Sequence, residues 1–509
     1  MNGDFSRVTF NPFKYFTRVV LQQGRVQTDA DGNEQTAILL HHLRILAADL
    51  IGQHGGPQDV FTGQGNQRTV TRRNCGFAII AAHKVNANTT NFFPSEDVLS
   101  VDEKAKLKQT TDRIPLQITT GHYYVDGLLC ENEEYRRYSE QPYLPRPEDE
   151  LSDLKNGIYF FYVDVWERLV TALDDPMIRE VALGGADTAA RAKLIWQVKI
   201  APESNLLTPD VNCTNFNDIW PDLRKLLEPN NRGRLSAMAK ASDGGGGDDV
   251  CITAPEARYR GIENQLYRVE VHRGGPALDS SDPNQQTPAT FKWSRDNATV
   301  VATLKHREGD RLIVSGLRDF SRWFTAGSWV EITHEALELS GRPGTLVRLA
   351  KVEGETLTID PYTTTETIYE AGTDFEDAPI RNLKVRRWDH TQQDDDLLQD
   401  GAIPIDEGVL IDLEDGVQIQ FAENTPATQY RSGDYWLIPA RVATGDVEWP
   451  KQPAPDPRDN TKTIEVPKPI PPHGVEHHYA PLALVTLDGG HVTVVVDLRH
   501  KFPASAVCQ

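Results

Sequence analysis

The longest amphipathic pattern in the chain lies near its start and predicts a helix. Leucines recur at spacings of 4, 3 and 4 residues, at Leu39, Leu43, Leu46 and Leu50. This periodicity is typical of one face of a helix, and Gly52 marks its end. Asp31 fits the N-cap position, with Glu34 completing a capping box. We therefore expect a helix over residues 33–51 that packs either on its own chain or on a neighbouring subunit.

Patterns typical of β-strands cover much of the chain after this helix. Residues 157–168 are dense in aromatic and β-branched side chains, which favour strands. Asp126-Gly127 and Asp415-Gly416 each lie between two apolar runs and predict hairpins. Residues 86–112 and 201–250 lack such patterns, and we expect them to be irregular.

Two later segments depart from this pattern. Short apolar runs at close spacing over residues 306–365 predict a small β-barrel. Because a strand-like run follows at 383–388, we expect the barrel to be inserted into a larger β domain. Eight prolines over residues 450–472 predict an extended arm, since each fixes its own φ and restricts the residue before it.

These patterns together predict a mainly β, multi-domain protein that begins with an extended arm and a helix, followed by sandwich-like or barrel-like domains. A chain of 509 residues is also too long for a single hydrophobic core. The expected domains are an arm and helix at 1–56, a β-rich domain at 57–305 with a flexible loop near 201–250, the inserted barrel at 306–365, and a C-terminal β domain at 366–509.

Composition and charge exclude several classes of partner. With 39% hydrophobic and 25% charged residues, the chain has an ordinary globular composition. A formal net charge of −21 argues against a nucleic-acid-binding or anionic-membrane surface. No apolar run approaches the roughly 20 residues of a membrane span, so we expect no direct insertion. Residues 1–4 show no basic or apolar signal region, which predicts synthesis in the cytoplasm without a signal peptide.

The cysteines and histidines give only weak signals for metal binding. The five cysteines form no CxxC pair. If the protein leaves the cell, Cys213 and Cys251 are candidates for a disulfide bond. The alternative is that both are free, buried thiols. His477 and His478 form the densest potential metal site. Neighbouring strand residues point to opposite faces, so these two would share a metal only on a symmetry axis between subunits. Structural hydrogen bonding is the simpler interpretation.

No catalytic residues or cofactor can be assigned. The acidic segment at 29–34 resembles a calcium loop but has Glu34 and Leu40 where an EF-hand needs Gly and Glu. Asp389-His390 has no partnered nucleophile and is expected in a polar loop. Motifs for phosphate binding or nucleophilic hydrolysis are missing from the sequence. Carboxylate pairs for glycan hydrolysis need only proximity in space, so a glycan-degrading enzyme stays open as a third hypothesis.

Several segments resemble a family of phage-tail-like proteins that are encoded beside contractile injection systems. They are residues 3–7, 21–27, 29–31, 33–35, 164–168, 180–188, 261–270, 291–296, 433–436 and 476–482. The arm is also loosely similar to the start of phage baseplate and tail-fibre proteins, in which an arm and helix precede β-rich domains. The resemblance implies a structural particle component and carries no activity over to individual residues.

The resemblance therefore implies a non-enzymatic structural subunit of an injection particle, at its baseplate or fibres, within the cell or released from it. The arm at 2–27 would dock on other subunits, for instance by adding a strand to a neighbour. The helix would contribute to a homo-oligomer, with a trimer as the first expectation by analogy to tail proteins. The predicted docking residues are Phe5, Arg7, Phe10, Gln23, Arg25, Leu39, Leu43, Leu46 and Leu50.

The second hypothesis is an adhesin that binds carbohydrate or a cell surface. Trp323, Trp329 or Trp436 on a β scaffold would then contact the ligand. Tryptophan buries a large apolar area, so a place in the core is the alternative for each.

Overall fold

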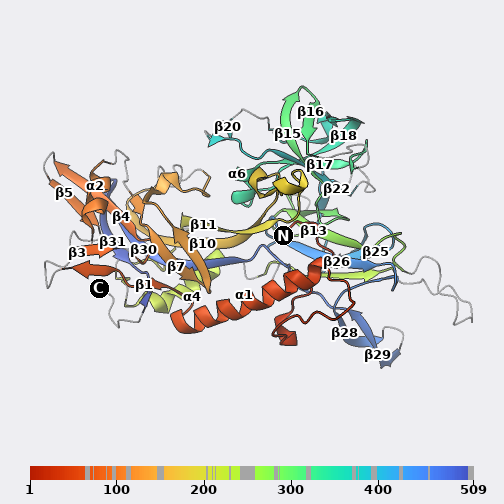
Figure 1. Ribbon diagram of the computed structural model, residues 1–509, viewed down its shortest axis with the longest axis horizontal. Coiled ribbons are helices and arrows are strands. Elements are labelled where there is room, and N and C mark those ends of the chain that lie inside the picture. Colours follow the sequence, from red (N-terminus) through yellow and green to blue (C-terminus); the bar gives the residue numbers. More distant parts are fainter. Residues whose placement is uncertain are drawn as a thin grey trace, which may run out of the picture.

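The computed structural model describes the chain except residues 63–68, 73, 87–88, 94–98, 110–115, 146–153, 202–203, 209, 213, 229–230, 241–257, 280–284, 286, 317–322, 370–373, 376–377, 391–397, 424–427, 457–458 and 503–509. It is a mainly β, multi-domain protein, as the sequence predicts. The described strands form two β lobes and a closed barrel, and a long N-terminal helix runs beneath both lobes (Figure 1).

The first lobe combines three four-stranded sheets with the orders β32-β1-β7-β8, β5-β4-β6-β9 and β11-β10-β30-β31, and the short pair β2–β3. Its strands are β1 (His54–Pro57), β2 (Val60–Thr62), β3 (Thr69–Arg72), β4 (Ile79–Asn86), β5 (Thr89–Phe93), β6 (Leu116–Ile118), β7 (Gly121–Val125), β8 (Leu128–Asn132), β9 (Arg136–Arg137), β10 (Gly157–Val170), β11 (Arg191–Ile200), β30 (His477–Asp488), β31 (His491–Asp497) and β32 (Lys501–Phe502). The C-terminal strands thus complete sheets that the N-terminal third begins.

Strand β10 is the centre of this lobe because both of its faces are buried. Phe161 and Val163 point into the core between the sheets. Phe160 and Tyr162 pack on the other face with the aromatic side chains of helix α4 (Phe216–Leu227). A strand covered on both sides needs apolar residues at successive positions, which explains the near-continuous apolar run in its sequence.

The second lobe contains a five-stranded sheet, β23-β14-β13-β26-β27, and a three-stranded sheet, β12-β25-β24. Its strands are β12 (Leu235–Ala239), β13 (Gln265–Arg273), β14 (Thr290–Ser294), β23 (Ile403–Pro404), β24 (Leu410–Asp412), β25 (Val417–Phe421), β26 (Tyr435–Arg441) and β27 (Asp446–Val447). Strands from the segments expected as separate domains, 57–305 and 366–509, therefore share sheets in both lobes.

The barrel closes in the order β15-β16-β19-β18-β17-β22. Its strands are β15 (Val301–Glu308), β16 (Arg311–Ser315), β17 (Trp329–Thr333), β18 (Thr345–Glu353), β19 (Thr356–Asp360) and β22 (Lys384–Trp388). The run at 383–388, expected outside the barrel, is the strand that closes it, because β22 pairs with both β15 and β17. The barrel strands lie in sequence between β14 and β23, two neighbours in one sheet.

Three segments differ from the sequence expectations. Residues 86–112, expected to be irregular, include β5 and helix α2 (Val101–Gln109). Residues 201–250 contain α4 and β12, whereas their glycine-rich part at 243–249 lies outside the described residues. The proline-rich arm forms a hairpin of β28 (Lys451–Asp456) and β29 (Asp459–Pro467), which projects from the second lobe (Figure 1). In this two-stranded sheet each strand has one unpaired edge. A proline is tolerated where the backbone N–H would otherwise point away from the partner strand.

Helix α1 (Asp29–Ile51) begins earlier than predicted. Its N-cap is Thr28, and the capping partner is Asp31, whose carboxylate accepts from the Thr28 backbone amide at 2.9 Å. Glu34 does not take part in the cap and instead accepts a hydrogen bond from Thr9 at 2.6 Å. Thr28 and Asp31 are three residues apart, as are Asp31 and Glu34, so both pairs fit a capping box. The earlier pair forms it, and the helix therefore starts before the predicted position.

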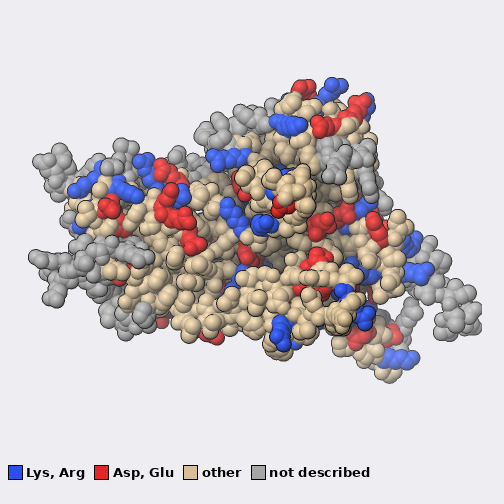
Figure 2. Space-filling view, in the orientation of Figure 1, with Lys and Arg blue, Asp and Glu red and all other residues tan. Residues whose placement is uncertain are grey.

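Charged side chains are spread unevenly over the face in Figure 2. Acidic and basic residues are interspersed over the lobes and the barrel, whereas the lower edge, where α1 lies in Figure 1, is largely uncharged. Helix α1 carries four acidic residues and one arginine, so most of the net charge of −21 lies elsewhere in the chain.

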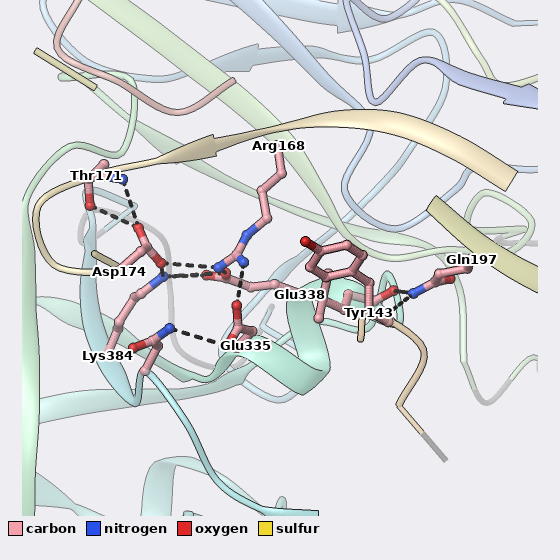
Figure 3. A network of polar contacts seen from close by, with 10 residues as sticks. Tyr143, Arg168, Thr171, Asp174, Gln197, Glu335, Glu338 and Lys384 are labelled. Carbon is pink, nitrogen blue, oxygen red and sulfur yellow. Dashed lines mark hydrogen bonds and ion pairs between the residues drawn. The ribbon is translucent and has the colours of Figure 1, made fainter. Parts of the chain in front are cut away.

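A network of charged residues joins the first lobe to the barrel (Figure 3). Arg168, near the end of β10, contacts Asp174 at 3.1 Å and two carboxylates of the barrel helix α6 (Glu335–Leu339), Glu335 at 2.8 Å and Glu338 at 2.5 Å. Lys384 of β22 contacts Asp174 at 2.5 Å and Glu338 at 3.2 Å. Burial would raise the pKa of Glu338, but Lys384 and Arg168 outweigh it and hold this pKa below its usual range.

His390 is fully buried where the barrel meets the second lobe, although the sequence indicated a polar loop. Its Nε2 donates to the Gly401 carbonyl at 2.7 Å, and its ring stacks on Trp329 with centroids 5.8 Å apart. Burial lowers the pKa of His390 to about 4, so the folded protein holds a neutral imidazole there.

We predict that acid destabilises the fold in part through His390. The unfolded chain binds a proton below the ordinary histidine pKa of about 6.5, whereas the folded chain resists protonation until about pH 4. The free energy of unfolding should therefore fall as the pH drops through this window, by up to about 1.4 kcal/mol per pH unit for this one group. Urea unfolding of the wild type and of His390→Gln at pH 7 and pH 5 measures how much unfolding free energy each protein loses, and the variant should lose less. An equal loss of stability in both proteins would contradict this role.

Candidate assembly surface and polar cavity

The N-terminal arm is attached to the second lobe at its first residues. Phe5 packs beside Leu266, Tyr435 and Leu437. The amide of Asn297 donates to the carbonyl of Gly3 at 2.8 Å. Phe5, predicted to dock on a partner, therefore anchors the arm to its own chain.

Beyond this anchor, the arm folds back along the first half of α1. Three hydrogen bonds connect them: Ser6 N to Asp29 Oδ2 at 2.9 Å, Thr9 Oγ1 to Glu34 Oε2 at 2.6 Å, and Val19 N to Gln35 Oε1 at 2.8 Å. The ring of Phe10 also lies 5.5 Å from that of His41, and Arg7 pairs with Glu448 at 3.4 Å. The arm and α1 thus form one unit, which we call the arm–helix unit (residues 1–51).

Few side chains of α1 are buried against the lobes. Ala30 and Ile38 are its buried residues. Arg44 pairs with Glu167 of β10 at 2.9 Å, which attaches the middle of the helix to the first lobe. The turn at Gly127 approaches the backbone of the helix, since a Cβ placed there would lie 2.2 Å from the Arg44 carbonyl oxygen.

The predicted leucine stripe faces solvent. The exposed fractions are 53% for Leu39, 60% for Leu43, 55% for Leu46 and 76% for Leu50. Arg44 is the only charged residue between positions 35 and 48, which agrees with the largely uncharged lower edge in Figure 2. Monomeric proteins rarely expose a contiguous apolar surface of this kind without a binding role.

The arm adds further exposed apolar side chains that the sequence did not single out. They are Val8, Phe13, Tyr15, Phe16, Val20, Leu21 and Val26. The predicted docking residues Gln23 and Arg25 are also exposed, at a turn through Gly24. An extended arm has no helical or strand period, so no pattern distinguished its apolar positions from core residues.

A polar cavity of about 470 Å³ opens near the C-terminal end of α1. It is lined by Gln53, Asp126, Arg224, Glu228, Arg232, Arg431, Glu476, His477, His478 and Tyr479. The residues come from the segment after α1, the β7–β8 turn, the C-terminal part of α4 and the residue after it, the segments that precede β12 and β26, and the start of β30 with the residue before it. They are far apart in sequence, which is why sequence reasoning found only the two histidines.

The two histidines bind different carboxylates, in keeping with their opposite orientations on a strand. Nδ1 of His477 lies 2.7 Å from Asp164, which also accepts from Lys199 at 2.7 Å. Nδ1 of His478 lies 3.0 Å from Asp126. Among the described residues, no three His, Cys, Asp or Glu side chains are grouped as a metal site. The histidines therefore have the structural hydrogen bonds that the simpler interpretation predicted.

The tryptophans of the adhesin hypothesis occupy different environments. Trp329 is 4% exposed and Trp436 is fully buried, so both belong to cores. Trp323 is 36% exposed. The proposed disulfide lies outside the described residues, because neither Cys213 nor Cys251 is among them.

Fold and surface together define a multi-domain, mainly β protein with an exposed N-terminal apolar unit. The chain belongs to DUF6519, a family of unknown function, whose model matches residues 1–73, 85–212 and 222–496. Comparison with curated proteins and with solved structures gave no match. In the part of the chain that the structure describes, no helix is long and apolar enough to cross a membrane. The family description names no activity, so the role implied by the phage-tail resemblance stays a prediction.

We predict that Gly127→Ala loosens α1. Gly127 has φ +79°, and an added Cβ would collide with the Arg44 carbonyl, so the helix must shift. We expect a loss of about 1–3 kcal/mol in stability and faster hydrogen exchange in the second half of α1. Gly309→Ala is the matched control, since it shares a positive φ of +62° but has no atom within 4 Å. Equal exchange of α1 in both variants would show that this contact does not hold the helix.

Proposed function

We propose that this protein is a non-enzymatic structural subunit of a contractile injection system or a related phage-tail-like particle, associated with its baseplate or fibres. The arm–helix unit is its assembly site. The observation that carries the proposal is the leucine stripe of α1, each member of which is more than half exposed. The resemblance of the arm and other segments to phage-tail-like proteins supplies the kind of assembly.

The energetics of the stripe favour a bound state. Complete burial of one leucine side chain is worth about 1.5–3 kcal/mol. Four leucines on one helix, together with exposed arm residues such as Phe13 and Tyr15, can therefore stabilise a specific contact. The low charge of this face reduces the desolvation cost of covering it.

The spacing of the stripe favours a second copy of the same helix as its occupant. Spacings of 4, 3 and 4 residues place the leucines at the a and d positions of a heptad, and identical helices can interdigitate such positions. The stripe is short, so the contact adds to other subunit contacts rather than forming a long coiled coil. We keep the trimer as the expected state by analogy to tail proteins.

We predict that Leu43→Glu combined with Leu46→Glu abolishes self-association. Leu43 and Leu46 are 60% and 55% exposed, so covering the rest of both side chains is worth about 2–3.5 kcal/mol. Each introduced carboxylate would also lose its hydration in the contact, so the dissociation constant should rise by at least about a hundredfold. Sedimentation equilibrium gives the mass of the full chain, and circular dichroism checks its fold. Leu410→Glu on β24 is the control, because Leu410 is also 52% exposed but lies away from α1. A monomeric wild type, or equal association of all three proteins, would contradict this use of the helix.

The particle itself provides the test of the wider proposal. High-mass particles are pelleted from a lysate of the native host, and their proteins are identified by mass spectrometry. We expect this chain in a fixed ratio to tube and sheath subunits. Its recovery in the supernatant alone, as a small oligomer, would overturn the particle role even if the chain self-associates.

A further inference from the structure

The polar cavity contains a partly buried cation that differs from its neighbours. Two of the three lining arginines have carboxylate partners: Arg224 contacts Glu228 at 2.8 Å, and Arg232 contacts Asp434 through Nε at 2.9 Å. Arg431 forms no ion pair with any described residue and lies beside the hydroxyl of Tyr479. A partly desolvated guanidinium without an anion gains strongly from a carboxylate that can bind both of its nitrogens.

The same cavity offers a hydrogen-bond acceptor that also lacks a partner. His477 uses Nδ1 to contact Asp164, and burial lowers the pKa of its ring, so the neutral imidazole donates from Nδ1. Its Nε2 then carries a lone pair, and no described residue donates to it. The ring is held in place by stacking on Trp166, with centroids 4.8 Å apart. This fixed acceptor can take a hydrogen bond from a ligand donor such as a hydroxyl group.

Glu476 provides a second acceptor at the mouth of the cavity. Its side chain is exposed and has no hydrogen bond to a described residue. A ligand that satisfies all three groups must bring a carboxylate to Arg431 and hydroxyl donors to His477 and Glu476. A volume of about 470 Å³ lies within the range of small-molecule sites and accommodates a monosaccharide or disaccharide.

We infer that this cavity binds an acidic saccharide, a sugar that carries both a carboxylate and free hydroxyl groups. The carboxylate accepts from Arg431, and ring hydroxyls donate to His477 Nε2 and Glu476. A neutral sugar leaves the arginine unpaired, whereas a simple carboxylate leaves both acceptors without a donor. The inference does not depend on the proposed assembly role.

Isothermal titration of the full chain with D-glucuronate, D-glucose and acetate at pH 7 tests the inference. We expect glucuronate to bind with a dissociation constant at least tenfold lower than that of either comparison ligand. Equal binding of acetate would indicate a site for any carboxylate, and equal binding of glucose a site for any sugar. Either result, or no binding of glucuronate, would overturn the inference.

Two substitutions of cavity residues test whether glucuronate binds in the cavity. Arg431→Gln should reduce the affinity for glucuronate to that for glucose, and Glu476→Ala should reduce it about tenfold. Arg191→Gln is the matched control, because Arg191 is an exposed arginine on β11 outside the cavity. Melting temperatures within two or three degrees of the wild type would show that the variants fold. Unchanged affinity of a folded Arg431→Gln variant would place the ligand elsewhere and contradict the inference.

Discussion

The pairing of β10 with β30 is the contact on which the remaining architecture depends. It joins residues 157–170 to residues 477–488, so the barrel and the second lobe lie entirely between its two strands in sequence. The same pairing brings His477 to Asp164 and thereby forms one wall of the polar cavity. Beyond the paired region, β10 carries Arg168 to the carboxylates of the barrel helix. One long strand therefore sets the positions of the cavity and the barrel together.

The arm–helix unit has the opposite distribution of apolar residues from the lobes it crosses. The lobes bury their large aromatic side chains, such as Trp293 and Trp436, in closed cores. Helix α1 instead directs its leucines outward and is held by a few polar contacts, including Arg44 with Glu167. Such a helix buries little apolar surface against its own chain, with Ala30 and Ile38 as its buried residues. Its sequence is better explained by a surface that becomes buried only in an assembly, which is the basis of the proposed function.

Local features were predictable from the sequence, whereas long-range pairings were not. The turns at Asp126-Gly127 and Asp415-Gly416 both form with positive φ at each residue, as their chemistry requires. The composition of residues 157–168 predicts the strand β10, but it does not indicate that β10 pairs with β30. Helix α4 was missed because Pro221 interrupts a pattern that Phe216 and Leu223 otherwise fit. The leucine stripe could be predicted because it lies on one element, whereas the cavity draws on several distant segments and could not.

The sequence distance between β10 and β30 also has a consequence for biosynthesis. Contacts between residues more than 300 positions apart cannot form until residues 477–488 have left the ribosome. Topologies with such high contact order fold slowly, and their unpaired strands remain exposed in the meantime. Helix α1 emerges before both of these strands and carries exposed leucines on its outer face. The nascent chain therefore passes through a long period in which both the stripe and the open edge of β10 can attract other chains, and this protein is expected to depend on chaperones during its synthesis.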